Sequence, residues 1–305
     1  MTSPIPDYQN LDLSGEAQQA AARVEARAQE PASEAMFRQL VAPLVAPLDA
    51  TALTSQVKNV LEFGCGTAAL SRRMAIAAPM ATVYATDKSA GMLKVARYLV
   101  DAAHIQNVRI AAWDVLDEAA FPFPDVQFEL IASSVVIPYL SDEQTTDLAG
   151  RLAARLAPGG VLACVEQDWH SDALVFPRFD LLRRILNKEA RNMKPTLALG
   201  LRPALRRAGL SLLPRVSFLW TDDAYGAYTR DLLERFAVSA VAQGRITPEE
   251  QEEWLQTLED LAGEGDFYYG IVYHLVAGFS PSPSALRWGG RRSGAAQGGV
   301  PMDRA

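Results

Sequence analysis

Short apolar segments alternate with helix-forming segments through the middle of the chain. Five of these segments contain β-branched residues and predict strands, while the stretches between them have helical spacing. The predicted strands are residues 57–63, 81–86, 107–112, 126–133 and 160–167. Because this alternation is typical of parallel sheets with helices on both faces, we expect an α/β fold with a doubly wound sheet.

The boundaries of two helices in this region are marked by capping residues. Ser89 is suited to cap a helix over residues 90–103, and Ser141 with Gln144 forms a capping-box pattern ahead of residues 147–156. The sequence Ala-Pro-Gly-Gly at 157–160 is expected to end the second helix and start the fifth strand.

Two further helices precede the first strand. Residues 14–30 are rich in Ala, Gln, Glu and Arg, and we expect a helix that starts at a Ser14 cap and stops at Pro31. A second helix is predicted from Ser33 toward Pro43. Together they make residues 1–50 an N-terminal helical cap, which either covers the mouth of a ligand site or pads the edge of the sheet.

After Asp168 the alternation stops. Helices are predicted over 175–192 and 200–208, a strand over 211–220 and a final strand over 267–279. Between these strands, Thr247 is followed by Pro248 and Glu250, a strong helix start.

The segment 222–265 is too long for a hairpin loop, and we expect it to form a lid. Half of the aromatic residues in or beside this segment should pack in the core, and the others would suit a flat or apolar acceptor; the set is Tyr225, Tyr228, Phe236, Trp254, Tyr268 and Tyr269. The domain thus extends over 51–280, followed by a Ser-, Pro-, Gly- and Arg-rich tail at 281–305 that we expect to be disordered.

Charge and cysteine content limit the classes of partner. The net charge of -7 and the pI near 5.1 disfavour nucleic acid and anionic membranes, which select basic surfaces. A small-molecule partner is expected, and a homodimer is compatible with the sequence. Two cysteines, the lack of a signal peptide and the lack of an apolar run of about 18 residues favour a cytoplasmic protein without a membrane partner. The three histidines and two cysteines have no metal-ligand spacing.

The most informative motif lies at the end of the first predicted strand. Gly64 and Gly66 follow it directly, and a helix-forming stretch begins shortly after them. Glycines suit a sharp strand-to-helix turn that a ligand approaches closely. Glu62 favours an amino-acid cofactor, whose ammonium group it could bind, over a dinucleotide. The dinucleotide pattern also expects glycine at position 69, where this chain has Ala69.

Residues 57–167 resemble the class I S-adenosylmethionine-dependent methyltransferases, in particular the small-molecule branch that includes ubiquinone/menaquinone-biosynthesis and natural-product enzymes. The sequence Glu-Phe-Gly-Cys-Gly-Thr at 62–67 is similar to the family's first motif, although its common third glycine is Ala68 here. This resemblance implies a Rossmann-like sheet of seven strands, mostly parallel with an antiparallel last strand. It also implies S-adenosylmethionine as the cofactor.

The resemblance assigns roles to residues at the ends of the predicted strands. Asp87 lies 21 residues after Gly66 and is the expected ribose-binding acid, with capping of the next helix as its alternative role. Asp114 is expected to accept the adenine amine, or to cap the next turn, while the Val115 amide contacts the ring. The other expected cofactor contacts are Gly64, Cys65, Gly66, Lys88, Met92, Trp113 and Ser133.

The acceptor side is less well defined. Many relatives carry a histidine where this chain has Pro138, so Tyr139 becomes an expected substrate contact. Methyl transfer from a sulfonium needs a base only when the acceptor must lose a proton. The expected candidates for a base are His170 and Asp168, next to Trp169 as a second substrate contact, although a lone loop histidine is more often solvated or packed.

These patterns predict an enzyme that methylates an O, N or C atom of a small, secondary-metabolite or quinone-like molecule. The alternative is a cofactor-binding protein of the same fold that catalyses a rearrangement or cyclisation, or that serves as a non-catalytic subunit. A nicotinamide-dependent oxidoreductase is disfavoured by Glu62 and by the lack of a Tyr-x-x-x-Lys pair, and protein or RNA methylation by the lack of a basic face.

Overall fold

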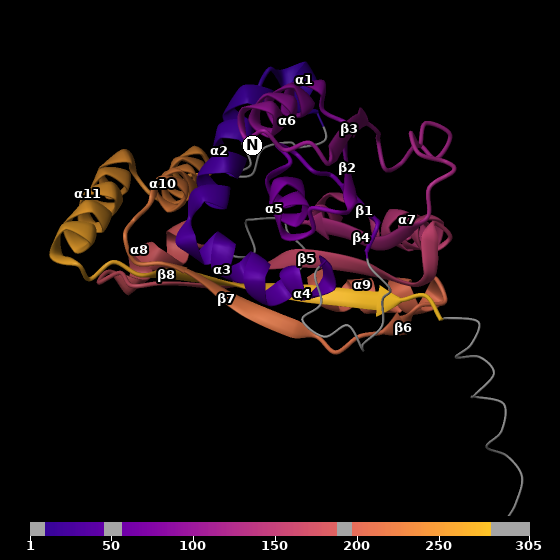
Figure 1. Ribbon diagram of the computed structural model, residues 1–305. Helices are drawn as coiled ribbons and strands as arrows, with labels where there is room; N and C mark the ends of the chain where they lie inside the picture. The colour runs from indigo at the N-terminus through magenta and orange to yellow at the C-terminus, as the bar shows by residue number, and fades with distance from the viewer. Residues whose placement is uncertain (1–9, 46–56, 188–196, 282–305) are drawn as a thin grey trace, which may run out of the picture.

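A mixed sheet of eight strands lies at the centre of the computed structural model, which describes residues 10–45, 57–187 and 197–281 (Figure 1). The strand order is β3-β2-β1-β4-β5-β8-β6, and β7 also pairs with β8. The strands are β1 (Asn59–Phe63), β2 (Thr82–Asp87), β3 (Val108–Ala112), β4 (Phe128–Ser134), β5 (Leu156–Leu174), β6 (Ser211–Leu212), β7 (Val216–Asp222) and β8 (Tyr269–Phe279).

Strands β1 to β5 pair in parallel, and β8 runs antiparallel to β5, β6 and β7. This confirms the predicted α/β fold with an antiparallel last strand. The number of strands differs, because the single strand expected over 211–220 is divided into β6 and β7. Pro214 lies between them, and a proline cannot donate a backbone hydrogen bond to the sheet.

The helices of the described residues are α1 (Leu11–Ser14), α2 (Ala17–Gln29), α3 (Pro31–Leu40), α4 (Ala42–Val45), α5 (Ala69–Ala77), α6 (Ala90–Ala102), the 3₁₀ turn η1 (Ile137–Tyr139), α7 (Asp142–Ala153), α8 (Phe179–Ile185), α9 (Leu197–Arg207), α10 (Ala227–Ala242) and α11 (Pro248–Glu264). None of them is both long and apolar enough to cross a membrane.

Three predicted helix caps are confirmed, although the helix after Ser141 begins at Asp142 and not at residue 147. Ser89 accepts a hydrogen bond from Met92 N at 3.1 Å, and both Ser141 and Thr247 form complete capping boxes. The helix after Ser141 ends at Ala153, earlier than expected, because the 157–160 turn belongs to β5.

The N-terminal boundaries were predicted wrongly. Ser14 is the last residue of α1, and α2 begins at Ala17. Pro31 does not only stop a helix: it occupies the first turn of α3, where its missing N–H costs nothing. The helix expected over 175–192 is reduced to α8, since β5 continues to Leu174; residues 188–196 lie outside the described part of the chain, as do 1–9, 46–56 and 282–305.

One hydrophobic core joins the N-terminal helices, the sheet and the segment 222–265. Phe37 of α3, Met74 of α5, Trp220 of β7 and Phe236 of α10 belong to the same buried cluster. A second cluster, on the other face of the sheet, packs α7 and α9 against β4 and β5. In Figure 1, α2 and α3 lie between the sheet and α10. The N-terminal helices and the segment 222–265 therefore form one continuous wall.

Candidate functional site

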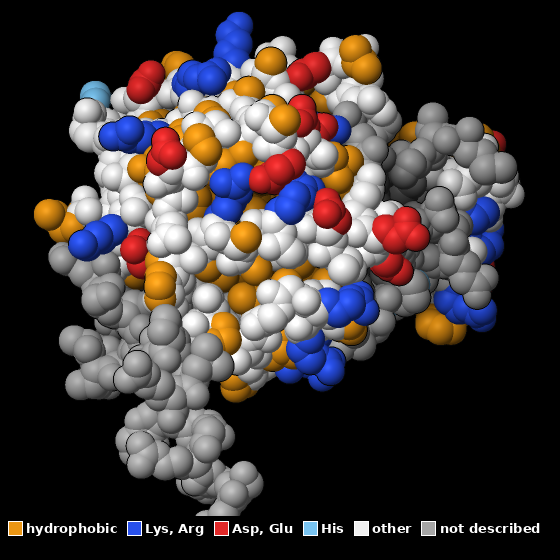
Figure 2. Space-filling view, turned by 90° about the vertical axis from the view of Figure 1, so that its right-hand side faces the viewer, with side chains coloured by type: hydrophobic (Ala, Val, Ile, Leu, Met, Phe, Trp, Pro, Cys, Tyr) orange, Lys and Arg blue, Asp and Glu red, His pale blue; other side chains and the backbone are white. Residues whose placement is uncertain are grey.

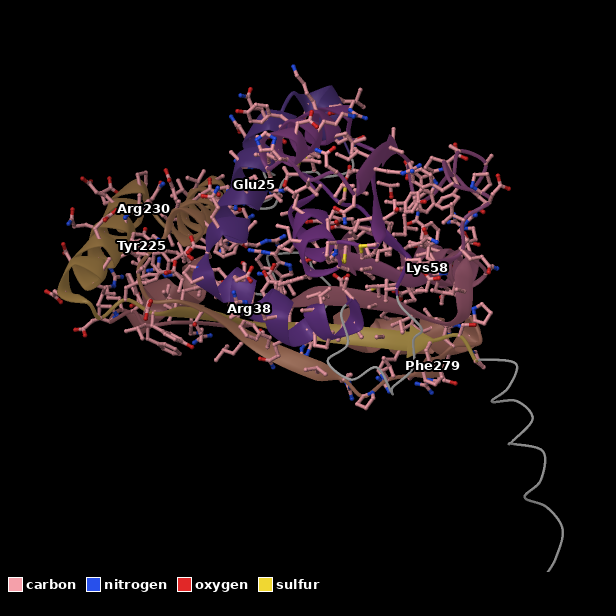
Figure 3. All side chains as sticks on the ribbon, in the orientation of Figure 1. Glu25, Arg38, Lys58, Tyr225, Arg230 and Phe279 are labelled. Atoms are coloured by element: carbon pink, nitrogen blue, oxygen red, sulfur yellow. The ribbon has the colours of Figure 1, made fainter. Side chains whose placement is uncertain are left out.

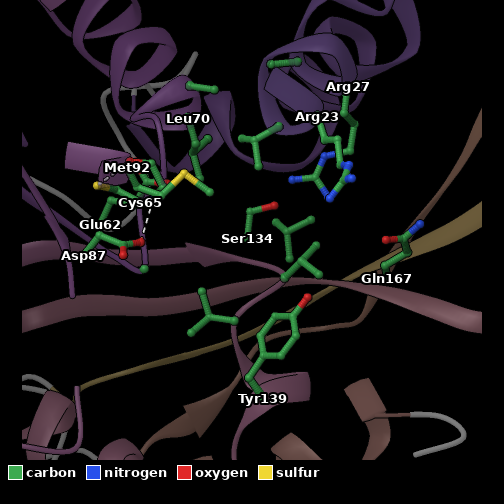
Figure 4. Close-up of a pocket in the computed structure, with 18 of the residues that line it drawn as sticks. Arg23, Arg27, Glu62, Cys65, Leu70, Asp87, Met92, Ser134, Tyr139 and Gln167 are labelled. Atoms are coloured by element: carbon green, nitrogen blue, oxygen red, sulfur yellow. Dashed lines mark hydrogen bonds between the residues drawn. The ribbon is translucent and has the colours of Figure 1, made fainter. Parts of the chain in front are cut away.

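A cavity of about 230 Å³ opens at the carboxyl ends of the parallel strands (Figure 4). One end is formed by the glycine loop and by the ends of β1, β2 and β3, and the opposite wall by α2, α3 and α10. Of the residues predicted from the sequence, it brings together Glu62, Gly64, Cys65, Gly66, Asp87, Lys88, Met92, Trp113, Asp114, Val115, Tyr139 and Trp169.

The glycine loop has left-handed backbone at three alternate positions. The φ angles are 63° at Gly64, 54° at Gly66 and 60° at Ala68. A Cβ on Gly64 would lie 2.5 Å from Cγ2 of Val136, so this glycine is needed for space as well as for conformation. Ala68 takes the place of the common third glycine, and it keeps the glycine-like conformation although it carries a Cβ.

Ala68→Gly is therefore expected to stabilise the protein by about 1 kcal/mol. A left-handed alanine is strained by about 1–2 kcal/mol, and glycine removes this strain. The greater conformational entropy of glycine in the unfolded chain offsets only part of that gain. Thermal unfolding measures the effect. The matched control is Ala69→Gly in the first turn of the helix α5, where glycine should destabilise the helix. A lower melting temperature for Ala68→Gly would contradict the assignment of strain to this residue.

Asp87, at the end of β2, holds the loop in place. Its Oδ2 accepts a hydrogen bond from Gly66 N at 2.8 Å, and its Oδ1 accepts one from Ser89 N at 2.9 Å. Burial raises the pKa of Asp87, while the two backbone N–H groups act in the opposite direction. The helix cap itself is Ser89, so Asp87 supports both the loop and the start of α6.

Glu62 is a buried acid on the cavity wall. The Ser71 hydroxyl donates a hydrogen bond to its carboxyl group, and burial raises the pKa of Glu62 to about 8. Burial therefore favours the protonated form of this acid at neutral pH. A neighbouring ammonium group would favour its ionised form.

Glu62→Gln should change how stability depends on pH. An acid whose pKa is raised in the native state binds more protons there than in the unfolded chain. Its contribution to the free energy of unfolding therefore falls as the pH rises from about 4.5 toward about 8. Glutamine removes this contribution, and the variant should gain at least about 1 kcal/mol relative to the wild type between pH 5 and pH 8. Thermal unfolding at both pH values tests it, and parallel pH profiles would contradict it.

Trp113, Asp114 and Val115 follow β3; Trp113 and Asp114 make local contacts, and all three residues line the cavity. Asp114 Oδ1 accepts a hydrogen bond from Leu116 N at 3.0 Å, which is the local turn expected as its alternative role. Trp113 is buried, donates from Nε1 to the Asp117 carbonyl at 2.8 Å and packs edge-on against Phe121. Both residues nevertheless line the cavity with Val115.

Two groups of predicted residues do not line the cavity. Ser133 pairs in register with Cys164 and lies in the sheet facing away from the cavity, whereas the next residue, Ser134, lines it. Neighbouring residues of a strand face opposite sides, so Ser134 and not Ser133 faces the cavity.

His170 and Asp168 are also absent from the cavity lining. They lie within β5, which extends past the point where the sequence predicted a loop, so alternate residues face opposite sides. Gln167 and Trp169 face the cavity, while Asp168 Oδ1 accepts a hydrogen bond from His170 N at 3.0 Å. Asp168 also lies 3.8 Å from His274 Nε2. The structure therefore gives these two residues no direct access to an acceptor in this cavity.

Several cavity residues were not identified from the sequence. Arg23 and Arg27 of α2, Arg235 of α10 and Gln167 of β5 all line the wall opposite the glycine loop. The two α2 arginines are four residues apart, a spacing that places them on one helix face and could have indicated a shared role. Among the aromatic residues of the segment 222–265 and its flanks, Tyr228 lines the cavity, whereas Phe236 and Trp254 are buried in the core.

The N-terminal helices are anchored to the glycine-loop end of the cavity. Glu25 of α2, labelled in Figure 3, accepts hydrogen bonds from Thr67 of the glycine loop and from Arg72, the latter at 2.7 Å. Asp12 of α1 accepts hydrogen bonds from Ser89 Oγ at 2.9 Å and from the next two backbone amides at the start of α6. The helical cap thus contacts the glycine loop and the start of α6.

On the face of the molecule shown in Figure 2, acidic and basic side chains are interspersed, and neither charge forms a large patch.

Comparisons with known proteins agree with this geometry. Residues 60–160 match the family model of the methyltransferase domain. A trans-aconitate 2-methyltransferase from Paracidovorax citrulli is 34% identical over 109 residues, which make up 36% of this chain and 38% of that protein. A malonyl-[acyl-carrier protein] O-methyltransferase from Hahella chejuensis is 29% identical over 37% of this chain and 41% of that protein.

The aligned part of this chain thus spans about two fifths of the length of these curated relatives. A solved structure of a candidate methyltransferase from Bacillus halodurans has the same fold, with a TM-score of 0.50 and 18% identity over 76% of this chain and 95% of that one. The matched residues include the glycine loop and the ends of β1 to β3, which form one end of the cavity. Residues 60–160 are therefore similar to a methyltransferase domain, and the chain shares the fold of this solved structure.

Proposed function

We propose that the protein transfers the methyl group of S-adenosylmethionine to a small organic molecule. The observation that carries this proposal is the placement of three carboxylates on one cavity wall: Glu62, Asp87 and Asp114 follow from three adjacent parallel strands. An amino-acid nucleoside presents an ammonium, a ribose and an adenine amine, all hydrogen-bond donors, and acceptors in this order match them.

In this proposal Glu62 faces the ammonium group, Asp87 accepts the ribose hydroxyls and Asp114 accepts the adenine amine. Gly64 and Gly66 allow the cofactor to approach the backbone, since a side chain at either position would fill that space or strain the turn. Met92 and Cys65 supply apolar contacts on the same wall. Ser134 replaces Ser133 as the expected polar group at the end of β4.

The bound sulfonium supplies an activated methyl group, and the residues on the opposite wall hold the acceptor in line with it. Holding two reactants at near-attack distance supplies much of the rate enhancement for such a displacement. Residues from the N-terminal helices and from α10 close this wall, including Phe37, Tyr228 and Leu232, so the protein excludes water from the reacting atoms.

The net charge of -7 and the cavity volume of about 230 Å³ support a small acceptor over a nucleic acid. The names of the curated relatives, which specify trans-aconitate and a malonyl group, support the same class. Incubation of the protein with S-adenosylmethionine labelled in the methyl carbon and a fractionated metabolite extract tests the proposal. We expect S-adenosylhomocysteine to form and the label to enter the small-molecule fraction. Label in protein or RNA, or no turnover, would contradict it.

A further inference from the structure

Arginine side chains gather at the end of the cavity that lies away from the glycine loop. Arg23 and Arg27 point from α2 into the cavity in Figure 4, and Arg235 lines it from α10. Arg23 Nε and Arg235 Nε lie 3.4 and 2.8 Å from the same Asp231 oxygen. Two guanidinium groups from two different helices thus share one carboxylate at the edge of the cavity.

The acids that line the cavity belong to its other end. Glu62, Asp87 and Asp114 all lie at the ends of β1 to β3. Near the arginines, Glu166 of β5 is fully buried and does not line the cavity, and burial raises its pKa to about 8. The cavity is therefore divided into an acidic cofactor end and a basic acceptor end, and the basic end attracts anions.

Gln167 provides an independent sign of a ligand at the basic end. Its side chain is only 2% exposed, and it faces the cavity across from Arg23 and Arg27 (Figure 4). Within the described part of the chain, neither its amide nitrogen nor its amide oxygen has a hydrogen-bond partner. Buried amides are nearly always paired, so this one is positioned to bind a polar group that enters the cavity.

We propose that the acceptor is a small organic acid, whose carboxylate is bound by Arg23, Arg27 and Gln167 and receives the methyl group on oxygen; this rests on the function proposed above. A guanidinium group matches a carboxylate by two parallel hydrogen bonds, and the Gln167 amide nitrogen adds a third donor. The arrangement therefore recognises the functional group rather than the apolar remainder of the molecule.

Methyl transfer to a carboxylate needs no general base among the residues that line the cavity. One carboxylate oxygen uses a lone pair to form the O–CH₃ bond, and the S–CH₃ bond breaks with its electron pair remaining on sulfur. The negative charge of the acid cancels the positive charge of the sulfonium, the products are a methyl ester and a thioether, and no proton is transferred. A base is unnecessary, which agrees with a lining that includes no histidine among the described residues.

The first test identifies the methylated atom. The small-molecule fraction from a reaction with methyl-labelled S-adenosylmethionine is treated with mild base, which cleaves methyl esters but not N-methyl, C-methyl or ether groups. We expect the label to be released as methanol. Label that stays on the product after base treatment would overturn the inference, while the transfer itself would still support the proposed function.

The second test measures anion binding to protein loaded with S-adenosylhomocysteine. Succinate, citrate and benzoate are titrated by calorimetry, with succinamide and inorganic phosphate as comparisons. We expect at least one acid to bind more tightly than both comparisons, and Arg27→Gln and Gln167→Leu to weaken it about tenfold or more. Arg38→Gln is the matched control, since Arg38 is exposed on α3 and pairs with Glu34 at 2.8 Å.

Each variant is first titrated with S-adenosylhomocysteine, and unchanged affinity shows that the fold and the cofactor end are intact. Acids that bind no better than succinamide, or equally well to Arg27→Gln, would overturn the inference, and tighter binding of phosphate would overturn the choice of a carboxylate. Failure of the wild type to bind S-adenosylhomocysteine would instead overturn the proposed function.

Discussion

Asp87→Ala is expected to weaken S-adenosylmethionine binding at least tenfold. The carboxylate is proposed to accept the ribose hydroxyls, and it also accepts hydrogen bonds from Gly66 N and Ser89 N. Losing a charged hydrogen-bond partner costs about 1.5–3 kcal/mol, which corresponds to at least a tenfold change in affinity. Calorimetric titration of the variant measures the effect directly.

Two further variants separate the ribose contact from the support of the loop. Asp87→Asn keeps the shape and one acceptor oxygen, and it should show a smaller loss than Asp87→Ala. Asp101→Ala removes an exposed carboxylate from the last turn of α6 and should bind the cofactor like the wild type. If Asp87→Ala retained its affinity, Asp87 would be removed from the cofactor site.

Gly64→Ala is expected to destabilise the protein by roughly 2–5 kcal/mol, the sum of a left-handed alanine and an overpacked contact. The new methyl group would lie 2.5 Å from Cγ2 of Val136, at a residue whose φ angle is 63°. Chemical denaturation should show the loss of stability, and cofactor affinity should fall with it because the loop must shift.

The contribution of the steric contact can be isolated with a second substitution. Gly64→Ala combined with Val136→Ala removes the clash and leaves only the backbone strain, so the double variant should be more stable than Gly64→Ala alone. Gly150→Ala is the control, because Gly150 is helical and exposed, and a Cβ added there would meet no atom within 4 Å. A Gly64→Ala protein as stable as the wild type would show that neither space nor conformation requires this glycine.

The convergence of Glu62, Asp87 and Asp114 on one cavity wall was predictable because its signals are local. These residues lie at or just after the carboxyl ends of β1, β2 and β3, and parallel strands place those ends at one edge of the sheet. Capping residues such as Ser89 and Ser141 depend on hydrogen bonds within one helical turn, so their positions could also be predicted.

The end of the cavity lined by arginines depends on contacts between distant segments. Arg27 and Arg235 meet the cavity only because α2 packs against α10, and no periodicity within either helix indicates that packing. The prediction for His170 and Asp168 depended on where β5 ends. Pairing with β8 extends β5 to Leu174, and this long-range pairing decides which of its side chains face the cavity.

Calorimetric titration of the wild-type protein with S-adenosylmethionine, S-adenosylhomocysteine and NAD tests the central claim most directly. Carboxylates matched to an ammonium, a ribose and an adenine predict binding of the first two ligands, with NAD binding much more weakly or not at all. Binding of NAD without binding of either S-adenosyl compound would contradict the account.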